Sequence, residues 1–336
     1  MIQLNKGINL GGWLSQCNYT RERYETFITE SDFAQIAAWK FDHVRVPFDY
    51  NVIEKENGEV IEENFKYLDS AVAWGKKYGL NVILDLHKTA GYDFNDFGNQ
   101  EKNNLFNNAH AQERFLAIWD RVSKRYANVS NVVFELLNEV ADLEFIDPWN
   151  KLIVKAVETI RKNASENPIV YGGVCWNSAS FVKALVPPPS TNIIYTFHLY
   201  EPLLFTHQKA HWVEALRNGK DIPFTDDMEF FRKESKVLGY MGENLLRAKC
   251  DKMGPEFFEE FLKEAVDTAK AQGVPLYCGE YGVIECADSF ETVKWFKAVH
   301  QIFEKYHIGH ALWSYKEMDF GFIGDHYKPL RDYILK

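Results

Sequence analysis

The chain has 336 residues and a net charge of −10, with 46% hydrophobic and 26% charged residues. These proportions are typical of a soluble globular protein and exclude a disordered or fibrous chain. The acidic balance, the lack of a long Lys/Arg run and the lack of a membrane-length apolar stretch argue against nucleic-acid, polyanionic and membrane partners. We expect one large domain that acts as a monomer.

The N-terminal sequence MIQLNKGINLGGW lacks the basic start, apolar run and cleavage site of a secretory signal. The five cysteines are odd in number and form no C-x-x-C pair, which fits a reducing compartment better than a disulfide framework. The localisation stays open between the cytoplasm and export of a mature form whose leader has been removed.

Short β-rich runs alternate with longer amphipathic stretches along the whole chain, which indicates repeated βα units. Eight runs are predicted as strands, at 6–10, 41–48, 81–87, 132–139, 168–174, 193–200, 274–280 and 309–315. Between them, apolar residues recur at intervals of three and four and predict helices, as in SFETVKWFKAVHQIFEKY. The pattern predicts a single (β/α)8 TIM barrel over residues 1–336.

Residues 201–255 interrupt this alternation after the sixth predicted strand, where barrels place loops of their catalytic face. The segment is rich in Phe, Trp, Leu and acidic residues, which predicts a small inserted subdomain. We expect it to wall a substrate cleft, with Trp212 and Phe205 as aromatic contacts. The alternative, that it covers only the flank of the barrel, stays open.

Polar and aromatic side chains gather at or near the ends of the predicted strands. They are Arg45, His87, Asn138, Glu139, His198, Tyr200, Glu280 and Trp313. Each one alone has an ordinary structural interpretation, such as an ion pair or a buried histidine. Because the C-terminal ends of barrel strands meet at one face, their coincidence favours a common functional site.

Two carboxylates among these residues suggest a reaction. Glu139 ends the fourth predicted strand and Glu280 the seventh, so they approach from opposite sides of the barrel mouth. Retaining glycoside hydrolysis needs such a pair about 5–5.5 Å apart, one protonating the leaving oxygen and one attacking the anomeric carbon. Arg45 or Tyr200 beside one carboxylate would keep it ionised, whereas drier surroundings would raise the pKa of the other. Spacing alone leaves open which glutamate has which role.

The ordered set of motifs resembles glycoside hydrolase family 5 across essentially the whole chain. The motifs are VRVPFDY, LDLH, FELLNEV, FHLY, YCGEYGV and ALWSY. The resemblance implies that Glu139 is the general acid/base and Glu280 the nucleophile. It also implies that Asn138 contacts the sugar 2-hydroxyl, and that Arg45 and Tyr200 support Glu280.

The resemblance further implies polar contacts around the reactive subsite for His87 and His198, and a stacking platform at Trp313. GINLGGW and THQKAHW are similar to segments of bacterial endoglucanases, which implies cleavage of internal bonds in β-1,4-glucan or mixed-linkage β-glucan. An exo-β-1,3-glucanase, a β-glucosidase or a glucomannan-active enzyme with the same two glutamates stays open as an alternative. Lys88 departs from the pattern, because such enzymes often carry a second histidine there.

Two other classes of protein could use some of these residues. A metal-dependent barrel hydrolase could draw on Asp85, His87 and His198, but the sequence lacks a tight H-x-H or H-E-x-x-H ligand arrangement. A carbohydrate-binding barrel without catalysis would need a blocked site, since the full set of site residues is present. We therefore expect a hydrolase that uses no metal and no other cofactor.

Overall fold

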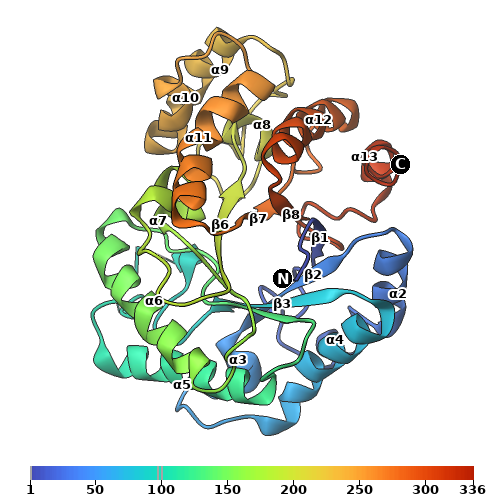
Figure 1. The fold of residues 1–336 in the computed structure, drawn as a ribbon. Coiled ribbons are helices and arrows are strands. Elements are labelled where there is room, and N and C mark those ends of the chain that lie inside the picture. The colour runs from blue at the N-terminus through green and yellow to red at the C-terminus, as the bar shows by residue number, and fades with distance from the viewer. Residues whose placement is uncertain (1, 97, 100) are drawn as a thin grey trace.

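The computed structural model describes residues 2–96, 98–99 and 101–336 and contains a closed barrel of eight parallel strands. Neighbouring strands in the sequence are neighbours in the sheet, and β8 pairs with β1. The strands are β1 (Lys6–Asn9), β2 (His43–Asp49), β3 (Asn81–Lys88), β4 (Val132–Glu135), β5 (Ile169–Gly172), β6 (Ile193–Leu199), β7 (Leu276–Tyr281) and β8 (Gly309–Leu312). The predicted (β/α)8 barrel is confirmed (Figure 1).

Helices surround the strands and bury one face each. The longer ones are α2 (Glu30–Ala38), α4 (Phe65–Tyr78), α5 (Ala109–Arg125), α6 (Ile146–Arg161), α11 (Pro255–Gln272) and α12 (Ser289–Tyr306). The shorter ones are α1 (Arg21–Thr26), α3 (Tyr50–Ile53), α7 (Val174–Asn177) and α13 (Lys328–Ile334), with 3-10 turns η1 (Glu62–Asn64), η2 (Phe94–Asp96), η3 (Leu143–Phe145), η4 (Ala179–Ala184) and η6 (Asp325–Tyr327). Within the described residues, none of these helices combines the length and apolar character that a membrane span requires.

Sequence signals set the helix ends and faces. The Asp288 side chain accepts hydrogen bonds from the first backbone amides of α12, and α4 ends at Gly79 with φ +73°. In α5 the buried residues recur at three- and four-residue intervals, including Phe115, Ile118 and Trp119. This spacing places one apolar stripe against the barrel.

The interior of the barrel is layered. An apolar cluster near the N-terminal ends of the strands contains Leu4, Ile83, Val133, Val170, Ile194, Tyr277 and Ala311. Because residues two apart on a strand point to the same side, Asp85 and Glu135 form the next layer above Ile83 and Val133. A polar layer therefore lies between the apolar floor and the C-terminal rim.

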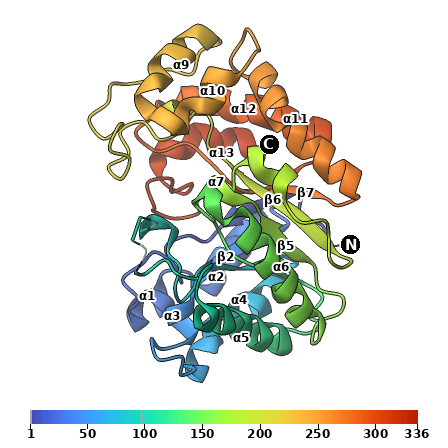
Figure 2. The same ribbon diagram turned by 90° about the vertical axis from the view of Figure 1, so that its left-hand side faces the viewer.

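The 201–255 segment lies between β6 and α11. It contains α8 (Leu203–Thr206), α9 (Met228–Glu234), η5 (Ser235–Gly242) and α10 (Glu243–Arg247). Figures 1 and 2 show α9 and α10, in gold, at one side of the barrel. Phe205 is fully buried because its ring packs against Phe224 at 5.3 Å. The prediction that Phe205 contacts substrate is therefore wrong, since its side chain has no exposed surface that a substrate could contact.

Candidate active site

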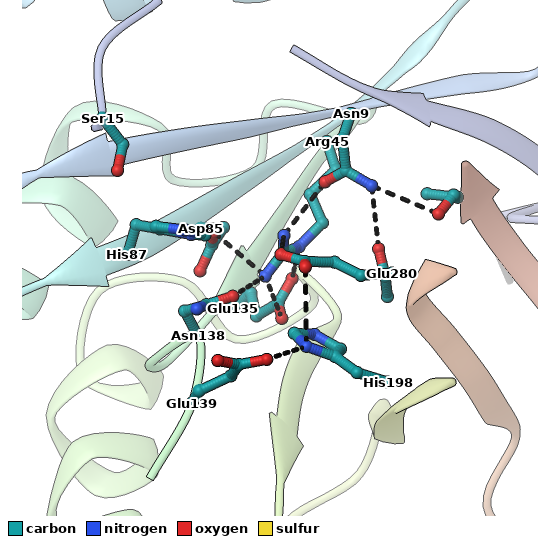
Figure 3. Close-up of polar contacts among 12 residues, drawn as sticks. Asn9, Ser15, Arg45, Asp85, His87, Glu135, Asn138, Glu139, His198 and Glu280 are labelled. Atoms are coloured by element: carbon teal, nitrogen blue, oxygen red, sulfur yellow. Dashed lines mark hydrogen bonds and ion pairs between the residues drawn. The ribbon is translucent and has the colours of Figure 1, made fainter. Parts of the chain in front are cut away.

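Arg45 is the centre of a buried polar network at the C-terminal end of the barrel (Figure 3). Its Nε and Nη2 donate to the two oxygens of Glu135 at 2.7 and 3.0 Å. Nη1 donates to Asn9 Oδ1 at 2.9 Å and to Glu280 Oε1 at 2.7 Å, and Nη2 also donates to Asn138 Oδ1 at 2.8 Å. All five guanidinium donors are thereby used, which fixes the position of each partner.

Three carboxyl groups surround this one positive charge. Besides Glu135 and Glu280, Asp85 Oδ2 lies 3.0 Å from Arg45 Nη2. Burial raises the pKa of Asp85 and of Glu135 to about 7, although the charge of Arg45 opposes this rise. Arg45 Nη1 also contacts Glu280 Oε1 directly, so the positive charge of Arg45 stabilises the ionised carboxylate of Glu280.

Glu280 lies on β7 with both carboxylate oxygens hydrogen-bonded. Arg45 donates to Oε1, and the Tyr200 hydroxyl donates to Oε2 at 2.9 Å. Burial raises the pKa of Glu280, while the Arg45 charge and the Tyr200 hydrogen bond lower it. Glu280 is therefore the member of the glutamate pair whose ionised form receives direct support, as a nucleophile requires.

Glu139 lies beyond the end of β4, not in the strand as predicted. The apolar run continues through Leu136 and Leu137, but β4 ends at Glu135. The backbone amide of Asn138 still donates to the carbonyl of Leu86 on β3 at 3.2 Å. This hydrogen bond keeps the loop, and with it Glu139, at the rim of the barrel.

Glu139 and His198 are in contact, with Oε1 2.6 Å from Nδ1. Burial and the negative charge of Glu280 raise the pKa of Glu139 well above its ordinary value. Burial, with the charge of Arg45, lowers the pKa of His198 well below its ordinary value. Both shifts favour a hydrogen bond from a protonated carboxyl to a neutral imidazole, and a carboxyl that stays protonated can act as a general acid.

The two glutamates lie close together. One oxygen of Glu139, one of Glu280 and a ring nitrogen of His198 lie within 4.8 Å of one another. An inverting glycosidase needs room for a water and separates its carboxyl groups by about 6.5–9.5 Å, whereas a retaining enzyme needs about 5–5.5 Å. The spacing fits the retaining geometry.

His87 and Trp313 form a parallel pair beside the glutamates, with ring centroids 5.9 Å apart and planes 4° apart. His87 Nδ1 lies 2.6 Å from Asp85 Oδ2, and Nε2 lies 3.1 Å from the Gln16 amide nitrogen. Burial lowers the pKa of His87 to about 3, so the neutral ring donates from Nδ1 and accepts at Nε2. Both nitrogens are thus engaged within the protein, and the contact of His87 with substrate stays a prediction.

Some residues of the site were missed by sequence reasoning. Glu135, Asn9 and Gln16 hold Arg45 or His87 in place. Glu135 had a usable signal, because a charged residue inside an apolar strand needs a buried partner. Lys88, the departure from the family pattern, pairs with Asp93 at 2.8 Å.

The chain matches known glycosidases in sequence and structure. The model for Cellulase (glycosyl hydrolase family 5) matches residues 5–319. Cellodextrinase A of Ruminococcus flavefaciens is 42% identical over 304 residues, which cover 90% of this chain and 83% of the relative. Endoglucanase C of Acetivibrio thermocellus is 39% identical over 340 residues, covering 98% and 96%.

Among solved structures, endoglucanase Cel5A from the hyperthermophilic Thermotoga maritima superimposes with a TM-score of 0.74 at 27% identity. The match covers 99% of this chain and 96% of that one. Together with the paired glutamates, these similarities extend over nearly the whole barrel. The chain therefore belongs to glycoside hydrolase family 5.

Proposed function

We propose that the protein is a retaining endo-β-1,4-glucanase that cleaves internal bonds of cellulose chains or mixed-linkage β-glucan. The observation that carries the proposal is the glutamate pair, in which Glu280 is supported as an anion and Glu139 is supported as an acid. Its relatives named endoglucanase and cellodextrinase, at 39% and 42% identity, support the choice of glucan.

The reaction proceeds by double displacement. A Glu280 carboxylate oxygen attacks the anomeric carbon while Glu139 transfers its proton to the departing sugar oxygen, which breaks the glycosidic bond and forms a glycosyl-enzyme. Glu139, now ionised, takes a proton from a water whose oxygen attacks the same carbon. Glu280 then leaves as a carboxylate, and the product keeps the β configuration.

Two neighbouring residues suit contacts to the reacting sugar. Arg45 only donates hydrogen bonds, so its bond fixes the amide oxygen of Asn138 and directs the amide NH2 group elsewhere. That group is suited to donate to the sugar 2-hydroxyl. Trp313, whose ring lies parallel to that of His87, is suited to supply an apolar ring face for stacking. The net charge of −10 suits a neutral carbohydrate, and we expect a monomer without nucleic-acid or membrane partners.

Product analysis tests this proposal. The substrates are carboxymethyl-cellulose, mixed-linkage β-glucan, laminarin, glucomannan and cello-oligosaccharides. We expect rapid viscosity loss on the first two, with short oligosaccharides as products. Glucose released from laminarin without viscosity loss would instead place the enzyme with the exo-acting alternative, and preference for glucomannan with the mannan-active one.

A second candidate is hydrolysis of short cello-oligosaccharides in preference to polymer. The observation that favours it is the 42% identity with a protein named a cellodextrinase. In the same panel, this activity would appear as rapid cleavage of cello-oligosaccharides with little change in the viscosity of the polymers.

Tyr200→Phe should change the pH dependence. The variant lacks the hydroxyl that donates to Glu280, so the pKa of Glu280 should rise. Because Glu280 must be ionised to attack, the acid limb of kcat/KM should move to higher pH. The measurement is kcat/KM on soluble mixed-linkage β-glucan across the pH range, and an unmoved acid limb would show that the hydrogen bond has no such role.

Trp212 is our candidate for substrate contact by the 201–255 segment. Its side chain is 48% exposed, and its ring lies 6.0 Å from His207. The His207 ring in turn lies 4.9 Å from Tyr200 and 5.5 Å from Phe320. A row of aromatic rings thus leads from Tyr200 beside Glu280 to Trp212, which favours a wall of the substrate site over a patch on the barrel flank.

Trp212→Ala should raise KM on polymer by roughly 3- to 10-fold with little change in kcat, because it removes stacking but no catalytic group. Trp212→Phe, the matched control, should retain most of the affinity. The measurement is steady-state kinetics on mixed-linkage β-glucan. Equal KM values for Trp212→Ala and the unchanged enzyme would favour the flank interpretation.

A further inference from the structure

A carboxyl group that the proposed reaction does not use lies directly after the end of β6. Glu201 follows Tyr200, whose hydroxyl donates to Glu280 Oε2 at 2.9 Å. The partly buried Glu201 carboxylate accepts from the side-chain amide of Asn244, on α10, at 2.8 Å. A carboxylate that is withdrawn from water needs such a partner, so the contact has a role in the fold or in the site.

Hydrogen bonds hold the Glu201 carboxylate in place. Burial raises the pKa of Glu201 to about 7, whereas hydrogen bonds from Asn244 and from the backbone of Glu201 and Tyr200 lower it. Among the described residues, no Lys or Arg forms an ion pair with this carboxylate. The carboxylate of Glu201 thus links the backbone of Tyr200 to α10.

The polarity of this link is fixed by a third group. The Ser180 hydroxyl, on η4, donates to Asn244 Oδ1 at 3.4 Å. Because the amide oxygen of Asn244 accepts from Ser180, its amide nitrogen is directed towards Glu201. The turn after β5, α10 and the end of β6 are therefore joined by one line of hydrogen bonds.

The backbone next to Tyr200 is also held by its neighbours. The Thr206 hydroxyl, on α8, donates to the Tyr200 carbonyl, and the Trp295 indole, on α12, donates to the Glu201 carbonyl at 2.9 Å. The Ile284 amide, in the loop after β7, donates to the Thr206 carbonyl at 2.9 Å. The turn that carries Tyr200 is thus tied to the loop that follows the nucleophile, and α10 adds a contact from a distant part of the 201–255 segment.

The position of Tyr200 matters because its hydroxyl supports the nucleophile. β6 ends at Leu199, so Tyr200 lies just outside the regular strand and its direction depends on the contacts of this turn. A hydrogen bond weakens steeply when its donor moves away from the acceptor or out of line. A group that fixes the turn can therefore change the ionisation of Glu280 without touching it.

We propose that Glu201 is a positioning residue for the reaction, which holds the Tyr200 hydroxyl on Glu280 through its own hydrogen bond with Asn244. The inference rests on the proposed function and deepens it, because it gives α10 a part in keeping the nucleophile ionised. Substitutions of Asn244 should accordingly act on the reaction through Tyr200.

A double-mutant cycle tests the inference. Asn244→Leu removes the donor, so the acid limb of kcat/KM on cellopentaose should move to higher pH, as in Tyr200→Phe. On that limb kcat/KM should fall by roughly 3- to 10-fold. In the Tyr200→Phe background, Asn244→Leu should change kcat/KM less than about twofold, because the hydroxyl that the contact positions is already gone. A purely structural contact would give additive losses instead.

Exchange of the two groups provides a rescue. Asn244→Asp places a second carboxyl group against Glu201 and should also displace the acid limb. Adding Glu201→Gln to Asn244→Asp restores a donor and an acceptor with reversed polarity, so most of the activity should return. Leu246→Ala is the matched control, since Leu246 is 40% exposed on the same α10 and the variant should match the unchanged enzyme.

Additive losses in the cycle, an unmoved acid limb in Asn244→Leu, or no recovery in the exchanged variant would overturn the inference. The circular dichroism spectrum shows whether each variant folds. If Asn244→Leu does not fold, the exchanged variant keeps a hydrogen bond at this place and still decides the question. If the unchanged enzyme cleaves neither cellopentaose nor any polymer of the panel, the proposed function fails instead.

Discussion

Glu280→Ala should lower kcat/KM on cello-oligosaccharides by at least about 10⁴-fold, because it removes the carboxylate that forms the glycosyl-enzyme. The loss should extend to β-cellobiosyl fluoride, since attack on the anomeric carbon is needed whatever group departs. Folding should be retained, because Arg45 keeps its ion pairs with Glu135 and Asp85. Kinetics on both substrates and the circular dichroism spectrum provide the measurement.

Glu139→Ala is the matched variant and should depend on the leaving group. Fluoride departs without protonation, so formation of the glycosyl-enzyme should survive on the fluoride but not on cello-oligosaccharides. Added azide then distinguishes the roles. It should attack the Glu139→Ala glycosyl-enzyme to give a β-glycosyl azide, and attack the substrate directly in Glu280→Ala to give an α-glycosyl azide. The opposite pairing of products would reverse our assignment of the two glutamates.

The barrel was predictable because its signals are local and repeated. Each strand is a short apolar run, and the shared direction of parallel strands brings their ends together. The same rule placed Glu139 and Glu280 at one site. The end of β4 was predicted too late because Leu136 and Leu137 extend the apolar run beyond Glu135, where the regular strand ends. Single backbone hydrogen bonds to the neighbouring strands continue at Leu136 and Asn138, so composition does not mark this boundary.

The aromatic residues of the 201–255 segment show the limit of sequence reasoning. Phe205 and Trp212 are both aromatic residues of the same segment, yet Phe205 is fully buried and Trp212 is 48% exposed. No periodicity separates them, because the segment folds through short helices whose packing is tertiary. The stacking of the Tyr240 ring on the Trp176 ring was not predictable either. It depends on left-handed residues that are not glycine and on a contact between segments that are far apart in the sequence.

Arg45 should be a sensitive position for stability, because three buried carboxyl groups share its positive charge. Arg45→Met leaves Asp85, Glu135 and Glu280 without their shared cation, and breaking a buried ion pair typically costs about 3–5 kcal/mol. We expect the free energy of unfolding to fall by about that amount in urea denaturation. Arg45→Lys should lose less stability, because it keeps the charge but offers three donors in place of five.

A double variant separates stability from catalysis. Adding Glu135→Gln to Arg45→Met removes one uncompensated carboxyl group beneath the site, so part of the lost stability should return. Activity should stay low, because Glu280 still lacks the positive charge that lowers its pKa. The acid limb of kcat/KM for the double variant should therefore lie at higher pH than that of the unchanged enzyme. Recovery of activity together with stability would mean that Arg45 supports only the fold. If stability returns while the acid limb of kcat/KM stays at higher pH, Arg45 has two roles. Its guanidinium then stabilises the polar layer of the barrel and also keeps the nucleophile Glu280 ionised.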